Sequence, residues 1–285
     1  FSRGFQYAFM AAVLMMVVSL IIFVINKNKF PDPAARKSQN ADKATHSKEE
    51  IKMSADEIRQ RIYALFAVFG VVIFFWLSFH QNGYSLTYFA RDYVNLDVIN
   101  INLGFTTIKG AEIFQCVNPF FVVSLTPLIM WFFGFLKKRG KEVSTPMKIG
   151  IGMGIASLAY VFLMLFSLTL PAKDALSSMS AEALSAIKVT PFVMIGLYFI
   201  LTVAELFISP LGLAFVSKVA PPHLQGLMQG CWLAATAIGN ALLFIGGILY
   251  TSVPIWACWL VFVGATGMSM LVMLSMVKWL ERVAR

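Results

Sequence analysis

The sequence predicts an all-α, polytopic membrane protein. Of its 285 residues, 59% are hydrophobic and 13% are charged, whereas soluble domains carry about a quarter charged residues. Seven long apolar stretches follow one another, and the segments between them alternate between many and few Lys and Arg residues. Transmembrane β-strands alternate in hydropathy over about ten residues, which these longer, uniformly apolar stretches do not do. Disordered, collagen-like and disulfide-rich secreted chains are excluded by composition.

Each apolar stretch is long enough to cross a bilayer as a helix, because about 30 Å of hydrocarbon requires about 20 residues at about 1.5 Å each. Glu205 is the one acidic or basic residue inside any of them. The predicted spans are residues 8–25, 62–79, 113–136, 149–172, 189–217, 227–250 and 253–277.

The distribution of Lys and Arg predicts which side of the membrane each segment faces. The segments 26–61, 137–148 and 218–226 and the tail after residue 277 together carry 18 basic residues, whereas the segments between them carry four. Cytoplasmic loops collect Lys and Arg, so we expect the first span to enter from outside and the C-terminus to be cytoplasmic. Topology then accounts for the net charge of +9 without a nucleic-acid partner.

A polar segment, residues 27–61, predicts a division of the chain into three parts. It mixes both charges with Ala, Ser and Pro and has few apolar residues, a composition typical of a linker. Near its end, Ser54 and Glu57 have the spacing of a capping box, which predicts a helix start. We expect residues 1–26 to close an upstream helix bundle and residues 62–285 to form a six-helix bundle. Because the sequence opens with Phe1, we expect it to be a piece of a longer protein.

Glycines and prolines inside the spans predict close packing and bends. Residues Gly150, Gly152 and Gly154 resemble a dinucleotide-binding run, but no strand precedes them, so close helix packing is the better interpretation. The same role is expected for a GxxxG pair, Gly226 and Gly230. Four prolines are expected to interrupt helices where neighbours satisfy the freed backbone groups: Pro119, Pro127, Pro191 and Pro210.

Glu205 is the strongest functional signal. An ionisable group inside a span costs at least about 2.5 kcal/mol on insertion scales and by default marks a functional site. Helical rise places Glu205 at mid-depth, where we expect it to bind a cationic substrate group or a proton. The alternative is a neutral, hydrogen-bonded acid or a pair with another helix. Asn118 precedes Pro119, which frees a carbonyl one turn earlier, so Asn118 is equally suited to that gap and to a helix–helix hydrogen bond.

Other candidates lie near the outer end of the second span and in the sixth. A His at position 80, followed by Gln81, can titrate near neutral pH and act in a gate, with a solvated interfacial His as the alternative. Trp76 and Trp232 are candidates for a cavity wall, with ordinary packing as the alternative. The three His and three Cys fall in separate or apolar segments, so neither a metal site, a cofactor motif nor an enzyme constellation is expected.

Three strings stand out in the predicted six-helix bundle. Residues 74–92 read FFWLSFHQNGYSLTYFARD, residues 115–132 read QCVNPFFVVSLTPLIMWF, and residues 204–240 read AELFISPLGLAFVSKVAPPHLQGLMQGCWLAATAIGN. They resemble, in turn, the seventh helix, the eighth helix, and the tenth and eleventh helices of the proton-dependent oligopeptide transporters, a family of the major facilitator superfamily. The resemblance implies that the first span is helix six and that residues 62–285 hold helices seven to twelve.

The resemblance also implies a function. It implies proton-coupled symport of di- and tripeptides by alternating access in the cell inner membrane, with this chain as the C-terminal half and the N-terminal half as its partner. Glu205 and Asn118 would bind the peptide's amino terminus, and Trp76 and Trp232 would line the side-chain pocket. Many relatives carry an acid where His80 stands, so the family's outer-gate ion pair is not expected here. The family's proton-coupling motif lies in helix one, outside this chain.

Two alternatives remain open from the sequence. A seven-helix receptor has the same expected topology, but a retinal protein would need a Lys in the last span, and residues 253–277 contain none. A carrier of another solute within the same superfamily is the second alternative.

Overall fold

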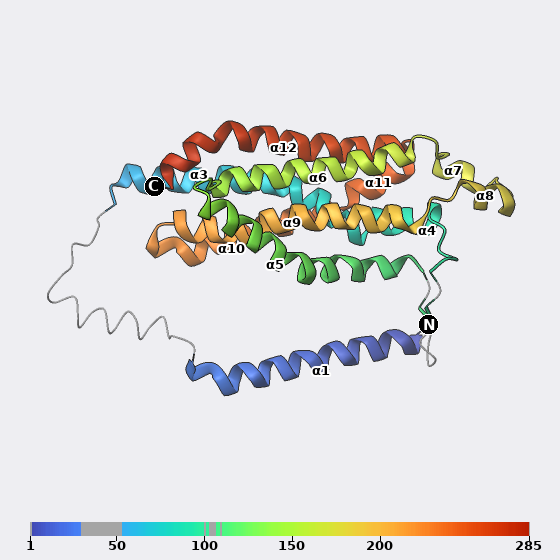
Figure 1. Ribbon diagram of the computed structural model, residues 1–285, viewed down its shortest axis with the longest axis horizontal. Helices are drawn as coiled ribbons and strands as arrows, with labels where there is room; N and C mark the ends of the chain where they lie inside the picture. The colour runs from blue at the N-terminus through green and yellow to red at the C-terminus, as the bar shows by residue number, and fades with distance from the viewer. Residues whose placement is uncertain (1, 30–52, 100, 103–106, 109, 285) are drawn as a thin grey trace. The chain divides into compact units, whose positions relative to one another are not determined.

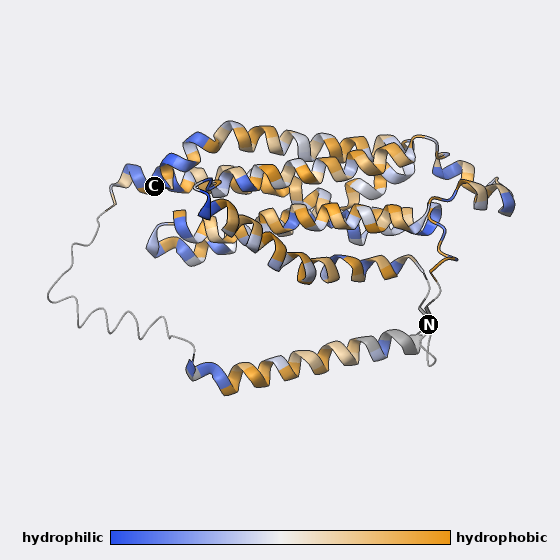
Figure 2. Ribbon diagram, in the orientation of Figure 1, coloured by the Kyte–Doolittle hydropathy of each residue, from blue (hydrophilic) through white to orange (hydrophobic). Residues whose placement is uncertain are grey.

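The computed structural model describes residues 2–29, 53–99, 101–102, 107–108 and 110–284. It consists of two compact units, residues 1–54 and residues 55–285, which are described separately. Within the described residues, seven helical segments are long and apolar enough to cross a membrane. Figure 2 shows hydrophobic residues along most of their length and hydrophilic residues at helix ends such as the C-terminal end of α12 (Ile255–Val283).

The first unit is a single long helix. Helix α1 (Ser2–Asn26) is followed by one turn of 3-10 helix, η1 (Lys27–Lys29). Its large apolar side chains are exposed along its length, as at Leu14 and Ile22, which are 65% and 57% exposed. Such a helix requires lipid or other helices around it.

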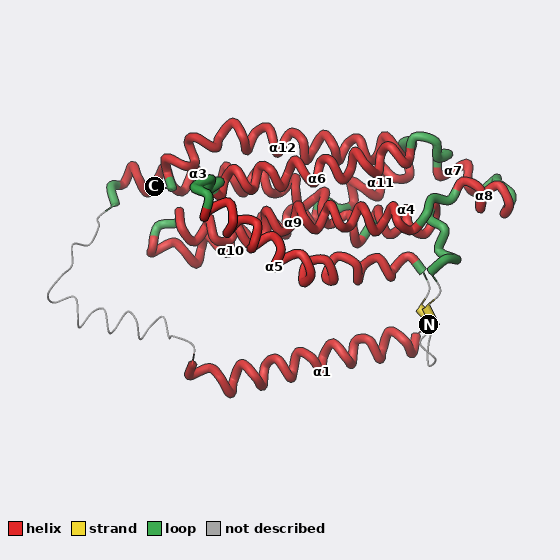
Figure 3. The backbone as a smooth tube through the Cα atoms, in the orientation of Figure 1, coloured by secondary structure: helices red, strands yellow, loops and turns green. Residues whose placement is uncertain are grey.

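The second unit is a helical bundle. Figures 1 and 3 show α3, α6, α9 and α12 lying side by side, with short helices and loops at the ends. The elements not yet given are α3 (Ala55–Phe79), η2 (His80–Gly83), α4 (Ser85–Tyr93), β1 (Ile101–Asn102), β2 (Thr107–Ile108), η3 (Ala111–Cys116), α5 (Val117–Lys138), α6 (Thr145–Ser167), α7 (Lys173–Leu176), α8 (Ala181–Ile187), α9 (Pro191–Val219), η4 (Pro222–Leu224), α10 (Gln225–Ala241) and α11 (Phe244–Ser252).

Small residues on α6 let it approach two neighbours closely. Helix α6 packs against α9 and α12. A Cβ atom at Gly152 would lie 2.8 Å from side-chain carbons of Phe207 and Ile208, and one at Gly150 would lie 3.0 Å from Leu274. The predicted packing role of this run is confirmed. For Gly226 and Gly230 it is wrong within the described bundle, because no described atom lies within 4 Å of either Cβ position.

Helix α3 ends at Phe79, as predicted, but starts earlier than the predicted span. It begins at Ala55, so the last seven residues of the predicted linker are helical, as the capping pair before it indicates. Residues 30–52 lie outside the described residues. Beyond Phe79 the chain stays mostly helical through η2 and α4, in a segment predicted to be a connection between spans. Beyond α4, the antiparallel pair β1–β2 and a parallel bridge between Val94 and Val189 are the β-structure of the described residues.

The predicted prolines have two different roles. Pro127 and Pro210 lie inside α5 and α9, as expected, but both helices continue past them without a break. Pro191 instead begins α9, where its missing N–H is one of the groups that a helix start leaves unpaired anyway. Its predicted role as an interruption is therefore wrong.

The sixth predicted span is broken into α10 and α11 by two residues, Leu242 and Leu243. The Gln81 side chain spans this break: its amide donates to the carbonyl of Leu243 at 3.4 Å and to that of Leu77 at 3.3 Å. Beyond the break, α11 is joined to α4, because the Tyr250 hydroxyl donates to the Asp92 carboxylate at 3.0 Å.

Candidate functional site

The Asn118 amide joins α5 to α9. Its Nδ2 atom lies 3.0 Å from Glu205 Oε2 and 3.0 Å from Thr202 Oγ1. Thr202 and Glu205 share one face of α9 because they are three residues apart. The Thr202 hydroxyl donates in turn to the carbonyl of Tyr198 at 2.7 Å. The structure therefore brings together the two polar residues that the sequence singles out, and Asn118 makes the helix–helix hydrogen bond that was one of its two predicted roles.

The negative charge of Glu205 is not matched by a basic side chain within the described residues. The salt bridges there are Arg61–Glu57, Arg91–Asp92 and Lys137–Glu142. Asn118 is a neutral donor and occupies one of the carboxylate's several acceptor positions. Glu205 is half-buried, so its carboxylate keeps acceptor capacity and an accessible surface. Such a group is suited to an ammonium or a proton.

Thr202 and Tyr198 also belong to this site, although neither is among the residues predicted from the sequence. Thr202 is fully buried, and Tyr198 is 1% exposed. The Tyr198 hydroxyl donates to the carbonyl of Asn82, at the end of η2, at 3.0 Å. The signal that could have found them is spacing, since positions three and seven before an intramembrane acid lie on its helix face.

Trp76 and Trp232 are almost fully buried, at 6% and 3% exposure. Trp76 stacks on His80 with ring centroids 4.8 Å apart and planes at 17°. Trp232 packs edge-on against Phe69, at 6.3 Å, and lies over Gly212, where a Cβ would be 2.0 Å from the indole ring. Both rings are packed among helices in this unit, and their role in a substrate pocket stays a prediction.

Two buried nitrogen atoms on α3 and η2 stand out. Neither Trp76 Nε1 nor His80 Nδ1 makes a hydrogen bond of ordinary geometry to the described residues. The indole nitrogen can only donate, and because buried polar atoms are nearly always paired, it favours an acceptor outside the described residues. A gating role for His80 stays a prediction.

Gln81 has a structural role that sequence reasoning missed. It is fully buried, and besides its two carbonyl contacts it accepts a hydrogen bond of 2.7 Å from the Ser85 hydroxyl. A Cβ at Gly246 would lie 2.2 Å from Gln81 Oε1. Gln81 thus fits tightly against α11, and its predicted link to a gate is untested.

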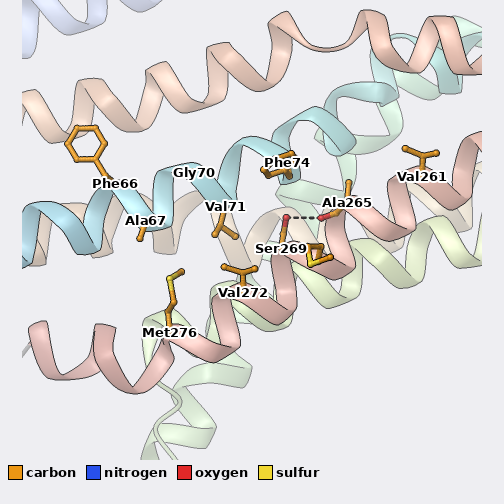
Figure 4. A pocket seen from close by; sticks show the side chains of 11 residues that line it. Phe66, Ala67, Gly70, Val71, Phe74, Val261, Ala265, Ser269, Val272 and Met276 are labelled. Carbon is orange, nitrogen blue, oxygen red and sulfur yellow. Dashed lines mark hydrogen bonds between the residues drawn. The ribbon is translucent and has the colours of Figure 1, made fainter.

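An apolar pocket of about 670 Å³ lies elsewhere, between α3 and α12 (Figure 4). Phe66, Val71 and Phe74 line it from α3, and Val272 and Met276 line it from α12. Its polar side chain is Ser269, whose hydroxyl donates to the carbonyl of Ala265 at 2.8 Å. Ligand sites usually hold a few polar groups that orient the ligand by hydrogen bonds. The one polar side chain named in this wall already bonds to its own helix, so the pocket is poorly suited to a peptide.

The fold and the site define a multi-pass α-helical membrane protein with the architecture of the major facilitator superfamily. A model of the POT family matches residues 32–253. The chain belongs to the POT family.

Two curated relatives show how this chain compares. A peptide transporter from Yersinia enterocolitica is 30% identical over 197 residues, which are 69% of this chain and 35% of the relative. Dipeptide and tripeptide permease B from Salmonella typhimurium is 29% identical over 198 residues, 69% of this chain and 36% of the relative. The chain thus spans only about a third of the length of these relatives.

Solved structures share the fold. A crystal structure of the peptide transporter POT in complex with sulfate has a TM-score of 0.65 and 22% identity, covering 99% of this chain and 54% of that one. A POT family transporter in complex with 5-aminolevulinic acid has a TM-score of 0.58 and 20% identity, covering 98% of this chain and 55% of that one. Membership of a transporter family leaves the seven-helix receptor alternative without support.

Proposed function

We propose that the chain forms the C-terminal part of a proton-coupled symporter of di- and tripeptides. POT family membership and relatives named as dipeptide and tripeptide permeases support the substrate class. Such a carrier moves its substrate without changing it chemically, so no enzymatic activity is proposed. Carriage of another solute is the alternative.

The observation that carries this proposal is the Glu205 carboxylate, held by Asn118 at 3.0 Å and free of any basic partner among the described residues. A peptide's terminal ammonium is a strong donor with three N–H groups, and a carboxylate flanked by an amide oxygen matches it. We assign Glu205 and Asn118 to the peptide's amino terminus, and Trp76 and Trp232 to its side chains. His80 and Gln81 are assigned to the outer gate.

The mechanism we propose is alternating access. The six-helix bundle and an N-terminal half of the same transporter would rock around a mid-membrane site. The exposed apolar face of α1 is consistent with a place among further helices. A proton bound at an acidic group would load the carrier, and its release would allow the empty carrier to return.

The proposed location is the inner membrane, with the C-terminus in the cytoplasm. The alternation of basic residues, 18 against four, supports this orientation through the positive-inside rule.

Uptake of a labelled dipeptide by the full-length transporter in proteoliposomes tests the proposal. We expect uptake to rise several-fold when an inward proton gradient is imposed. Glu205→Gln should lower peptide binding and uptake at least tenfold, because it removes the charge and keeps the shape. Glu182→Gln, at an exposed acid of α8, is the matched control. Gradient-independent uptake would remove proton coupling, and unchanged binding by Glu205→Gln would remove the site assignment.

A further inference from the structure

A polar cavity lies at the basic end of the bundle. Its volume is about 440 Å³, within the usual range for small-molecule sites. It is formed where the loop between α5 and α6 meets the C-terminal ends of α9 and α12. The polar residues that line it are Glu142, Ser144, Thr145, Lys148, Lys218 and Glu281.

The start of α6 contributes polar groups to this cavity. Ser144 is the N-cap of this 23-residue helix but makes no side-chain capping hydrogen bond, so its side chain leaves the backbone N–H groups of Thr145 and Met147 uncapped; Pro146, between them, has no N–H. These groups and the helix dipole attract anions. The Ser144 hydroxyl oxygen is itself buried and has no hydrogen-bond partner among the described residues. A buried hydroxyl of this kind indicates a missing acceptor.

Two lysines in the wall carry positive charge that no short ion pair cancels within the described residues. The salt bridges within the described residues include neither Lys148 nor Lys218. The Lys148 ammonium is half-buried and lies 4.3 Å from the centroid of the Phe133 ring, a contact that holds it without cancelling its charge. Lys218, near the end of α9, is exposed.

The carboxylates in the wall limit what can bind. Glu142 is already paired with Lys137, at 3.3 Å, so its charge is compensated. Glu281 makes no such pair among the described residues, and it repels a second negative charge. A ligand with a single negative charge therefore fits better than a dianion.

We propose that this cavity binds a phosphate group, with the Ser144 hydroxyl, the first turn of α6 and the ammonium groups of Lys148 and Lys218 as its donors. A phosphodiester carries one negative charge and several acceptor oxygens, which matches the wall. The cavity lies at an end of the spanning helices, so the source is either a phospholipid headgroup or phosphate in solution. Nothing in this proposal depends on peptide transport, and its test does not use transport.

Thermal unfolding of the full-length transporter in detergent tests the proposal. The ligands are dioctanoyl phosphatidylglycerol, inorganic phosphate and, as the matched lipid without phosphate, dioctanoylglycerol. We expect phosphatidylglycerol to raise Tm by about 2–4 °C and dioctanoylglycerol to leave it unchanged. A shift with the phospholipid alone identifies a headgroup site, and a shift with inorganic phosphate alone identifies a soluble ligand; both support the proposal.

Variants separate this site from general charge attraction. Lys218→Gln changes an exposed side chain and should reduce the Tm shift at least threefold; Lys148→Gln combined with it should abolish the shift. Ser144→Ala gives an independent variant with no change in charge, and it should also reduce the shift. Lys141→Gln, at an exposed residue of the same loop that does not line the cavity, should retain it. The proposal is overturned if none of the ligands shifts Tm, or if dioctanoylglycerol shifts Tm as much as phosphatidylglycerol does. It is also overturned if Lys141→Gln reduces the ligand-induced Tm shift as much as Lys218→Gln does.

Discussion

The side-chain amide of Asn118 donates to the carboxylate of Glu205 across 3.0 Å, between residues 87 positions apart in the chain. This bond fixes the rotamer of the acid, because the same amide nitrogen is also held at 3.0 Å from Thr202 Oγ1. The carboxylate is thus oriented before any ligand arrives, which lowers the ordering cost of binding.

Replacing Asn118 with Ala should weaken peptide binding by the full-length transporter. A hydrogen bond to a charged group contributes about 1.5–3 kcal/mol, so we expect Kd to rise about 10- to 100-fold. Isothermal titration calorimetry with a dipeptide measures this change. Ser124→Ala is the control on the same helix, since the Ser124 hydroxyl bonds only to the carbonyl of Phe120 within α5.

Asn118→Ala and Glu205→Gln should also be non-additive, because each removes part of one interacting pair. Once Glu205 is replaced by Gln, adding Asn118→Ala should therefore raise the Kd for the dipeptide by much less than 10-fold. Fully additive losses would show that the two side chains act on the ligand separately.

Gly212→Ala should destabilise the bundle. A Cβ at Gly212 would lie 2.0 Å from the Trp232 ring, and overpacking of this kind costs about 1–3 kcal/mol. We expect a lower Tm in detergent. Gly264→Ala, where no described atom lies within 4 Å of the Cβ position, should leave Tm nearly unchanged. In a Trp232→Leu background the cost of Gly212→Ala should shrink, and an undiminished cost would contradict the assigned contact.

Gln81→Leu should destabilise the junction between α10 and α11. It leaves the buried Ser85 hydroxyl without its acceptor and removes the bond to Leu243, so we expect a loss of about 1–3 kcal/mol. Unfolding of the purified transporter, followed by Tm, measures it. The matched control is Gln115→Leu: the Gln115 amide is also hydrogen-bonded, to Asn82 and Thr87, but it is exposed. Equal losses in the two variants would argue against burial as the cause.

His80→Ala should change the pH dependence of uptake. An imidazole ordinarily changes charge between about pH 5 and 8, so its removal from a gate should flatten the uptake profile in that range. Uptake by proteoliposomes at a series of external pH values measures this. His223→Ala, in η4, is the control, and a profile that coincides with wild type would reject the gating role.

Much of the architecture could be predicted from the sequence because apolar length sets membrane spans directly. Six of the seven predicted spans are each carried mainly by one long helix. The sixth is divided at Leu242 and Leu243, and this break escaped prediction because both residues are apolar and favourable in a helix. Its stabilising partner, Gln81, lies 162 residues away from Leu243, beyond the reach of any local pattern.

The residues of the candidate site also differ in how far the sequence alone reveals them. Glu205 and Asn118 could be found because polar groups inside spans are costly and therefore rare. Thr202 and Tyr198 are not singled out, since hydroxyl and aromatic residues are common in membrane helices and satisfy their own polar atoms there; only their spacing from Glu205 marks them.

The division of the sixth span gives its two pieces different neighbours. Helix α10 packs on α3 and α9, whereas α11 is tied to α4 through Tyr250 and Asp92. The sixth membrane-spanning segment therefore consists of two short helices, α10 and α11, joined at a two-residue break. We expect a movement of α10 at the basic end of the bundle to be accommodated by bending at Leu242 and Leu243. Helix α11, at the opposite end, can then keep its position.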